Sequence, residues 1–185
     1  MPSPVGHALA GLMVGLAMRP VTLGTLPLGT LGTVRTLGTL ACAAVLPDID
    51  FLWGRHNMET HSLGAAAIAG LGVLAWTRGR NPRLALAVTL AWASHVLFDW
   101  LGSDDTAPLG VMALWPVSSA FYFADAYVFE AISRRYWLPN FLTHNAWAVA
   151  KELLILGPPL LALTAFRSRA RRRCRHPGTA SRPRA

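Results

Sequence analysis

Cysteine is nearly absent from this chain, and the two cysteines that occur do not suggest a pair. Cys42 lies in an apolar segment, Cys174 lies in an arginine-rich end, and the 185 residues contain no Cys-x-x-Cys motif. We therefore expect no dependence on disulfides. The first residues also lack the basic stretch of a cleavable signal peptide, so we expect the first apolar segment to be retained.

Acidic side chains are missing from the end of the chain, where the positive charge is concentrated. From Arg167 onward there are eight arginines and no acid, whereas the preceding chain has nine bases and nine acids. This segment has no interleaved aromatic residues, so we do not expect it to bind nucleic acid. We expect residues 167–185 to form a disordered tail beside a membrane, on the cytoplasmic side where arginines are favoured.

Charged residues are also scarce within the body of the chain, which is too apolar for an ordinary soluble protein. Hydrophobic residues make up 53% of the sequence. The composition predicts an all-α protein, a multi-helical, multi-pass integral membrane bundle of about five or six helices in residues 1–166. The expected helices are residues 5–18, 31–47, 62–77, 84–101 and 146–166.

Prolines and glycines interrupt these apolar segments. The sequence Pro27-Leu28-Gly29 predicts a break before the second helix, and Gly157-Pro158-Pro159 predicts a kink in the last one. Residues 108–132 are rich in aromatic side chains. They fit either an interfacial helix or a sixth membrane segment, and the sequence does not decide between the two.

The positions of the turns predict where polar residues of different helices meet. Helices 62–77 and 84–101 are joined by a basic turn near Asn81, and His61 and Asp99 lie almost equally far from it along the sequence. At a rise of about 1.5 Å per residue, an antiparallel hairpin brings them to the same depth. His7 and Asp50 are related in the same way about residue 28. Both hairpins are therefore expected to deliver polar residues to one end of the bundle.

Histidines and aspartates at the ends of apolar segments are the most informative feature of the sequence. Ionisable side chains are costly to bury, so their recurrence indicates a shared partner, for which a divalent metal ion is the candidate. Four imidazoles and three carboxylates suffice for one or two ions, most favourably zinc, with manganese or iron as alternatives. The candidate ligands are His7, Asp48, Asp50, His56, His61, His95 and Asp99.

Each candidate ligand also has an ordinary interpretation. A lone histidine such as His7 is commonly an interfacial polar group, and Asp48 and Asp50 follow a proline as residues of a turn or helix cap do. His95 and Asp99 carry more weight, because residues four apart on a helix project from one face and a buried aspartate needs a partner. Asp50 could also bridge two ions or take a proton from an attacking water.

The order of these motifs resembles that of a known family. An early histidine, Leu-Pro-Asp-Ile-Asp at residues 46–50, the two histidines of residues 56–61 and His95-x3-Asp99 are similar to motifs of the inner-membrane metal-dependent hydrolases, also known as LexA-binding, inner membrane-associated hydrolases. Residues 114–118 and 143–158 are similar to the carboxyl half of that family. The resemblance covers nearly the whole chain before the arginine-rich end.

The resemblance implies an inner-membrane protein with a metal centre, similar in its ligand types to zinc-dependent phospholipases C and nucleases. Metal ions can activate a water, and a site at bilayer level suits a phosphoester or lipid-like substrate. We therefore expect a membrane-bound metal-dependent hydrolase with Asp50 as catalytic residue. One position departs from the family pattern, because Asn57 stands where an arginine is usual; if that arginine binds an anionic substrate group, Arg55 is a candidate replacement.

Two other functions fit the same residues. An ion or proton transporter predicts that the polar residues lie near the middle of the membrane, and a structural or regulatory protein predicts a metal that only stabilises the bundle. The residues encode no recognisable contact with a protein partner. The basic turn at residues 78–83 and the tail predict an outward-facing site, whereas Arg134 and Arg135 argue against that orientation.

Overall fold

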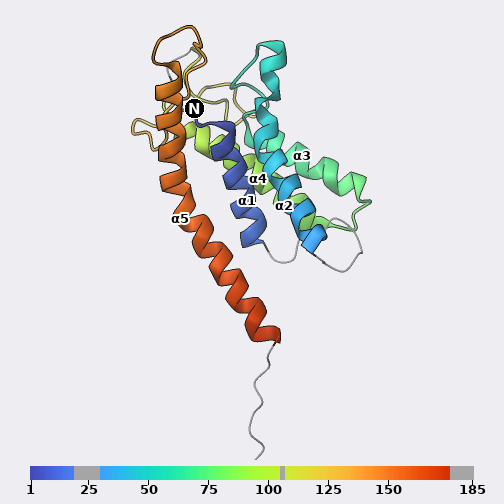
Figure 1. Cartoon of the computed structure of the whole chain (residues 1–185). Coiled ribbons are helices and arrows are strands. Elements are labelled where there is room, and N and C mark those ends of the chain that lie inside the picture. Colours follow the sequence, from blue (N-terminus) through green and yellow to red (C-terminus); the bar gives the residue numbers. More distant parts are fainter. Residues whose placement is uncertain (19–29, 105–106, 176–185) are drawn as a thin grey trace, which may run out of the picture.

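The computed structural model describes residues 1–18, 30–104 and 107–175, and its regular structure is helical (Figure 1). One isolated β-bridge pairs Gly102 with Phe129 and another pairs Val111 with Tyr122, and these described residues contain no strand. The predicted all-α class is therefore confirmed. The elements are α1 (Pro4–Ala17), α2 (Thr30–Val45), the 3₁₀ helix η1 (Leu46–Trp53), α3 (Leu63–Trp76), α4 (Pro82–Trp100) and α5 (Phe141–Arg175).

Three helices begin at side chains that cap their free backbone N–H groups. Ser3 accepts a hydrogen bond from Gly6 N at the start of α1, and Ser62 accepts one from Ala65 N at the start of α3. Asn81 does the same for α4, where a proline occupies the first turn. Such caps satisfy amides that have no partner within the helix. They fix the helix starts beside His7 and His61.

The helices pack through small side chains. The main apolar core lies between α2 and α4. Helix α3 also packs against α4, and a short turn at residues 77–81 connects these two helices. Gly11 of α1 lies so close to α2 that an added Cβ would be 2.3 Å from the Leu40 carbonyl oxygen. Close backbone approach of this kind is typical of membrane helices. The buried core consists of Leu40, Ala43, Ala44, Leu84, Ala87, Val88 and Ala91.

Two helical segments in the described ranges are long and apolar enough to cross a membrane. They are Gly32–Trp53 and Phe141–Arg169, whereas α1 and α3 are shorter apolar helices. The predicted multi-span bundle is therefore not confirmed. The second segment carries an exposed apolar surface, as expected of a helix that contacts lipid. Its exposed large side chains include Leu142, Trp147, Leu154, Leu161 and Phe166.

The structure differs from the sequence predictions in two segments. Residues 108–132 form neither an interfacial helix nor a sixth membrane segment; they are loops and turns held by backbone hydrogen bonds such as Val111 N to Tyr122 O at 2.9 Å. Helix α5 continues through Arg175, well into the predicted tail, because arginine and alanine favour helix. Residues 176–185 and the predicted break at 27–29 lie outside the described residues.

The last helix contains both prolines of the predicted kink. Pro158 and Pro159 lie inside α5, and Figure 1 shows that this helix changes direction part-way along its length. A proline removes a backbone donor and its ring crowds the preceding turn, so a bend is expected there. The second half of α5 extends beyond the other helices (Figure 1).

Replacing Gly11 with alanine tests the close packing of α1 on α2. The added methyl group would meet backbone atoms that cannot rotate away, so we expect a loss of about 1–3 kcal/mol and a Tm lower by about 2–12 °C. Gly38→Ala is the matched control, since nothing lies within 4 Å of its Cβ position on α2. Thermal unfolding in detergent measures both; equal Tm values for the two variants would contradict the packing.

Candidate metal centre

The predicted polar residues lie at helix ends that meet in space. His7 is in the second turn of α1, Asp48 is in η1, and His61 directly precedes the cap of α3. His95 and Asp99 occupy the last turns of α4. The α3–α4 hairpin brings His61 Nε2 to 3.3 Å from Asp99 Oδ2, so the predicted equal depth of these two residues is confirmed.

Asp99 is the centre of the cluster. Its Oδ1 lies 3.3 Å from His7 Nε2, and its Oδ2 lies 2.9 Å from His95 Nε2. The two rings are stacked with centroids 3.8 Å apart. All three side chains are buried, at 3% exposure or less. The Asp99 carboxylate thus lies among imidazoles that come from α1, from α4 and from the loop before α3.

Asp48 completes the cluster from the more accessible side. Its Oδ1 lies 3.6 Å from His61 Nε2 and 3.7 Å from His95 Nε2. The Asp48 side chain remains 20% exposed, whereas those two histidines are fully buried. The interior of the cluster is therefore buried, and on one side the Asp48 carboxylate is partly accessible.

Several of the converging atoms have no hydrogen-bond partner. Although His95 Nε2 and Asp99 Oδ2 are 2.9 Å apart, they do not point along a common N–H···O line. Buried polar atoms are nearly always satisfied, so a group of unsatisfied ones requires an explanation such as a bound ion. Among the described residues, the unsatisfied buried atoms of this cluster are His7 Nδ1, His61 Nε2, His95 Nε2, Asp99 Oδ1 and Asp99 Oδ2.

Hydrogen bonds to the other ring nitrogens orient two of the histidines. His95 Nδ1 donates to the carbonyl oxygen of Ala44 at 2.8 Å, and His61 Nδ1 donates to Asp50 Oδ2 at 3.0 Å. In both rings the Nε2 atom then faces the cluster. Carbonyl and carboxylate partners of this kind fix the tautomer and orientation of metal-binding histidines.

Asp50 lies behind His61 and is fully engaged in hydrogen bonds. Its Oδ2 also accepts from the Thr60 hydroxyl at 2.7 Å, and its Oδ1 accepts from His56 Nδ1 at 2.8 Å. The other nitrogen of His56, Nε2, lies 3.1 Å from Met1 Sδ. Asp50 and His56 therefore adjoin the cluster, with their polar atoms directed toward other partners.

The electrostatic environment of His61 favours its charged form. Burial lowers the pKa of His61, but the nearby carboxylates of Asp48, Asp50 and Asp99 outweigh this and raise the pKa to about 9. Carboxylates surround the ring on both nitrogens, which explains the direction of the shift.

The donor set fits a divalent metal ion. Zinc takes four nitrogen and oxygen ligands at about 2.0–2.2 Å, so tetrahedral ligand atoms lie about 3.3 Å from one another. The observed separations between His7, His61, His95 and the carboxylates range from 2.9 to 3.7 Å. Two ligand groups can be distinguished, with atoms of each within 4.8 Å of one another: His7, His95 and Asp99, and Asp48, His56 and His61.

The structure thus brings all seven candidate ligands together, and it adds residues that the sequence did not identify. Thr60 and the Ala44 carbonyl act through hydrogen bonds to Asp50 and His95, which no spacing pattern reveals.

Glu152 is a buried carboxylate outside the predicted set of ligands. Its Oε1 accepts from Ser3 N at 2.6 Å, and its Oε2 accepts from the Ser3 hydroxyl. This anchors the N-terminus of α1, one turn before His7, to α5. A negative charge at a helix N-terminus is favourable. The feature of the sequence that indicates Glu152 is an acid within an apolar helix, which is also the feature that indicates Asp99.

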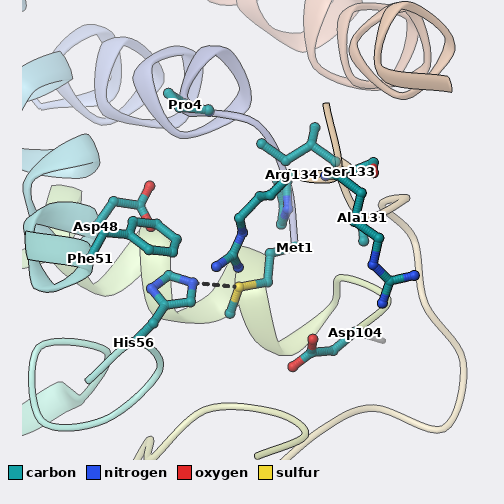
Figure 2. Close-up of a pocket in the computed structure, with 12 residues that line it drawn as sticks. Met1, Pro4, Asp48, Phe51, His56, Asp104, Ala131, Ser133 and Arg134 are labelled. Atoms are coloured by element: carbon teal, nitrogen blue, oxygen red, sulfur yellow. Dashed lines mark hydrogen bonds between the residues drawn. The ribbon is translucent and has the colours of Figure 1, made fainter. Parts of the chain in front are cut away.

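A cavity of about 450 Å³ borders the accessible side of the cluster (Figure 2). Asp48 and His56 lie on its wall, together with residues from the loop that precedes α5. Figure 2 shows the His56 ring between Phe51 and Met1 and facing the cavity. Residues at the edge of the cluster can therefore be reached by a small molecule.

Comparison with known proteins supplies the family. A family model described as YdjM inner membrane protein matches residues 1–172, which include every residue of the cluster. The chain belongs to the YdjM inner membrane protein family. No curated protein and no solved structure matches it. The resemblance to an inner-membrane family is therefore confirmed, and with it the inner membrane as the location of this YdjM-family protein.

Metal content tests the cluster directly. We expect the detergent-purified protein to contain stoichiometric divalent metal, and His61→Ala and Asp99→Ala to lose it, because each removes a buried donor. Asp125→Ala is the control, since Asp125 is exposed and lies outside the cluster. Elemental analysis of folded protein measures the content; unchanged metal in both cluster variants would exclude this site.

The raised pKa of His61 predicts opposite pH effects with and without metal. Because the folded state binds this proton more tightly than the unfolded chain, the metal-free protein gains stability that is fully present below about pH 6.5 and is lost as pH rises through about 9. A metal must displace the proton, so its apparent affinity should rise about tenfold per pH unit over that range. Thermal unfolding and competition with a chelator measure the two effects; a metal affinity independent of pH would contradict the assignment.

Proposed function

We propose that this YdjM-family protein is a membrane-bound metal-dependent hydrolase that acts on a phosphoester or lipid-like substrate. One observation carries the proposal: unsatisfied, buried imidazole and carboxylate atoms converge beside a cavity large enough for a small substrate group. Sites that combine metal ligands with an accessible cavity are typical of catalysis, whereas structural metal sites are closed.

The residues divide into ligands and residues that position them. His7, His61, His95 and Asp99 would hold the ion from the buried side, and Asp48 would bind it from the side that faces the cavity. A divalent metal supplies an acidic bound water and stabilises negative charge on a phosphoryl or acyl oxygen. Zinc suits this mixed nitrogen and oxygen donor set, with manganese or iron as alternatives.

Asp50 has the geometry of a positioning residue in this proposal. Both of its carboxylate oxygens accept hydrogen bonds, from His61, His56 and the Thr60 hydroxyl. A carboxylate behind a metal-binding histidine holds the ring and increases its basicity. His56, which joins Asp50 to the cavity wall, is then the more accessible group for moving a proton.

The location of the cluster favours an enzyme over a transporter. Asp48 and Asp50 lie close to the C-terminal end of the candidate span Gly32–Trp53, and the other ligands also lie at or near helix ends. A transport pathway needs polar groups near the middle of the membrane. The position at one end of the bundle instead suits a substrate that arrives at the membrane surface.

The proposed orientation places the cluster on the outward-facing side of the inner membrane. The basic turn at residues 78–83 joins the far ends of α3 and α4, and the arginines from Arg167 onward follow the second half of α5. Basic residues favour the cytoplasmic side. The ligand ends of α1 and α4 then lie on the opposite side.

The Asp50→Asn variant tests whether the metal takes part in catalysis or only stabilises the bundle. Asparagine keeps the shape but weakens the hold on His61, so we expect the rate of metal-dependent hydrolysis to fall about 10–100-fold. The substrates are p-nitrophenyl phosphate, bis-p-nitrophenyl phosphate and a fluorescent phospholipid in detergent micelles.

Asp125→Asn is the matched control and should hydrolyse these substrates at the wild-type rate. Bound metal without hydrolysis of any substrate, combined with unfolding of His95→Ala, would instead identify a metal that only stabilises the bundle.

A further inference from the structure

The cavity beside the cluster contains basic groups that the proposed ligands do not use. It extends from Asp48 and His56 to the loop at residues 131–135, which directly precedes α5. Its charged or titratable lining residues are Asp48, His56, Asp104, Arg134 and Arg135. A cavity that joins a cation-binding cluster to guanidinium groups is suited to an anion.

Arg134 reaches from this loop toward the cluster. Its guanidinium carbon lies 4.3 Å from the centroid of the Phe51 ring, and that ring stacks on His56 with centroids 3.7 Å apart. Figure 2 shows the Arg134 head group directed into the space beside Phe51, His56 and Met1. Stacking on an aromatic face holds a guanidinium in place while leaving its N–H donors available in the plane.

The acidic residues of the cavity are occupied by other partners. Asp48 faces His61 and His95, and Asp104 Oδ2 accepts from Gly110 N at 3.1 Å. Across the described part of the chain, no ion pair joins Arg134 to a carboxylate. Its positive charge is therefore directed to the cavity without a neutralising partner.

Arg55, the candidate that the sequence offered for this role, is placed elsewhere. Its guanidinium pairs with Glu59 four residues later, its side chain is 56% exposed, and it does not line the cavity. Asn57 is buried and its amide nitrogen lies 3.4 Å from Asp104 Oδ2. Arg134 is thus the guanidinium that lines the cavity and lies over Phe51, the ring that stacks on His56.

We infer that Arg134 binds the phosphate group of the substrate in this cavity and holds it beside the His/Asp cluster. The inference rests on the proposed function and narrows its substrate class to phosphoesters. The planar guanidinium matches two phosphate oxygens at once, and the cation on the opposite side would face the same group. A lipid headgroup and a soluble phosphoester share this chemistry.

This inference also accounts for basic residues that oppose the proposed orientation. Arg134 and Arg135 precede α5 at the cluster end of the bundle, where the distribution of basic residues in membrane proteins disfavours them. A role in binding substrate would explain the presence of an arginine at position 134. At a membrane surface its charge would also attract anionic headgroups.

Phosphate binding to the full chain in non-ionic detergent tests the inference. Inorganic phosphate is titrated into wild type, Arg134→Gln and Arg55→Gln, and bound metal is measured on the same samples. We expect Arg134→Gln to weaken phosphate binding about tenfold or more with metal content unchanged, because one charge-assisted contact is lost. Arg55→Gln is the matched control and should bind phosphate as the wild type does.

A second arm distinguishes the source of the phosphate. The proteins are placed in nanodiscs of phosphatidylglycerol or of phosphatidylcholine, and the enrichment of anionic lipid around each variant is measured. Loss of enrichment in Arg134→Gln indicates a headgroup. Equal enrichment, with loss of phosphate binding in detergent, indicates a soluble phosphoester. Either result supports Arg134 as the phosphate-binding residue.

The outcomes separate the two proposals. If Arg134→Gln and wild type bind phosphate equally, or if neither binds it while metal is present, the inference about Arg134 is wrong and the hydrolase proposal stands. If the wild type lacks metal but still binds phosphate through Arg134, the metal-dependent hydrolase is excluded and the anion site remains. If Arg134→Gln unfolds, Arg134→Lys replaces it; because lysine keeps the charge but cannot bind two phosphate oxygens with a planar fork, we expect weaker phosphate binding than in the wild type, and equal binding would overturn the inference.

Discussion

The burial of the Asp99 carboxylate among three imidazoles is the constraint on which the rest of the arrangement depends. Taking a carboxylate out of water costs several kcal/mol unless opposite charge or hydrogen bonds compensate. His7, His61 and His95 approach Asp99 within 3.3 Å, but its oxygens lack hydrogen-bond geometry toward any described residue. A cation between these atoms would satisfy the carboxylate and the imidazoles together.

The helices are arranged to make this convergence rigid. The α3–α4 hairpin sets the depth of His61 against Asp99, and the Ala44 carbonyl and Asp50 fix the rotation of the rings of His95 and His61. Glu152 ties the start of α1 to α5 and so holds the helix that carries His7. Helices α1 and α4, the η1 segment and the loop before α3 thus contribute ligands to one small volume, in which an error of an ångström would separate them.

The cavity gives this buried cluster an accessible side. Asp48 and His56 line the cavity wall at the edge of the cluster, and the Phe51 ring both stacks on His56 and lies under the Arg134 guanidinium. The same volume therefore combines groups that could hold a cation with the guanidinium that we propose binds an anion. In this YdjM-family inner membrane protein, whose helix α5 has an exposed apolar surface, this combination underlies the phosphoester substrate that we propose.

The sequence by itself determined the helical class, the main helices and the identity of the clustered residues, because apolar periodicity and the cost of burying charge are visible in one dimension. It also predicted the meeting of His61 and Asp99, since equal arms of a hairpin end at one level. Only the tertiary structure decided that residues 108–132 form loops, that Asp50 lies behind His61, and that Arg134 rather than Arg55 lines the cavity. These facts depend on contacts between groups far apart in the chain, and their distances are set by helix packing rather than by spacing along the sequence.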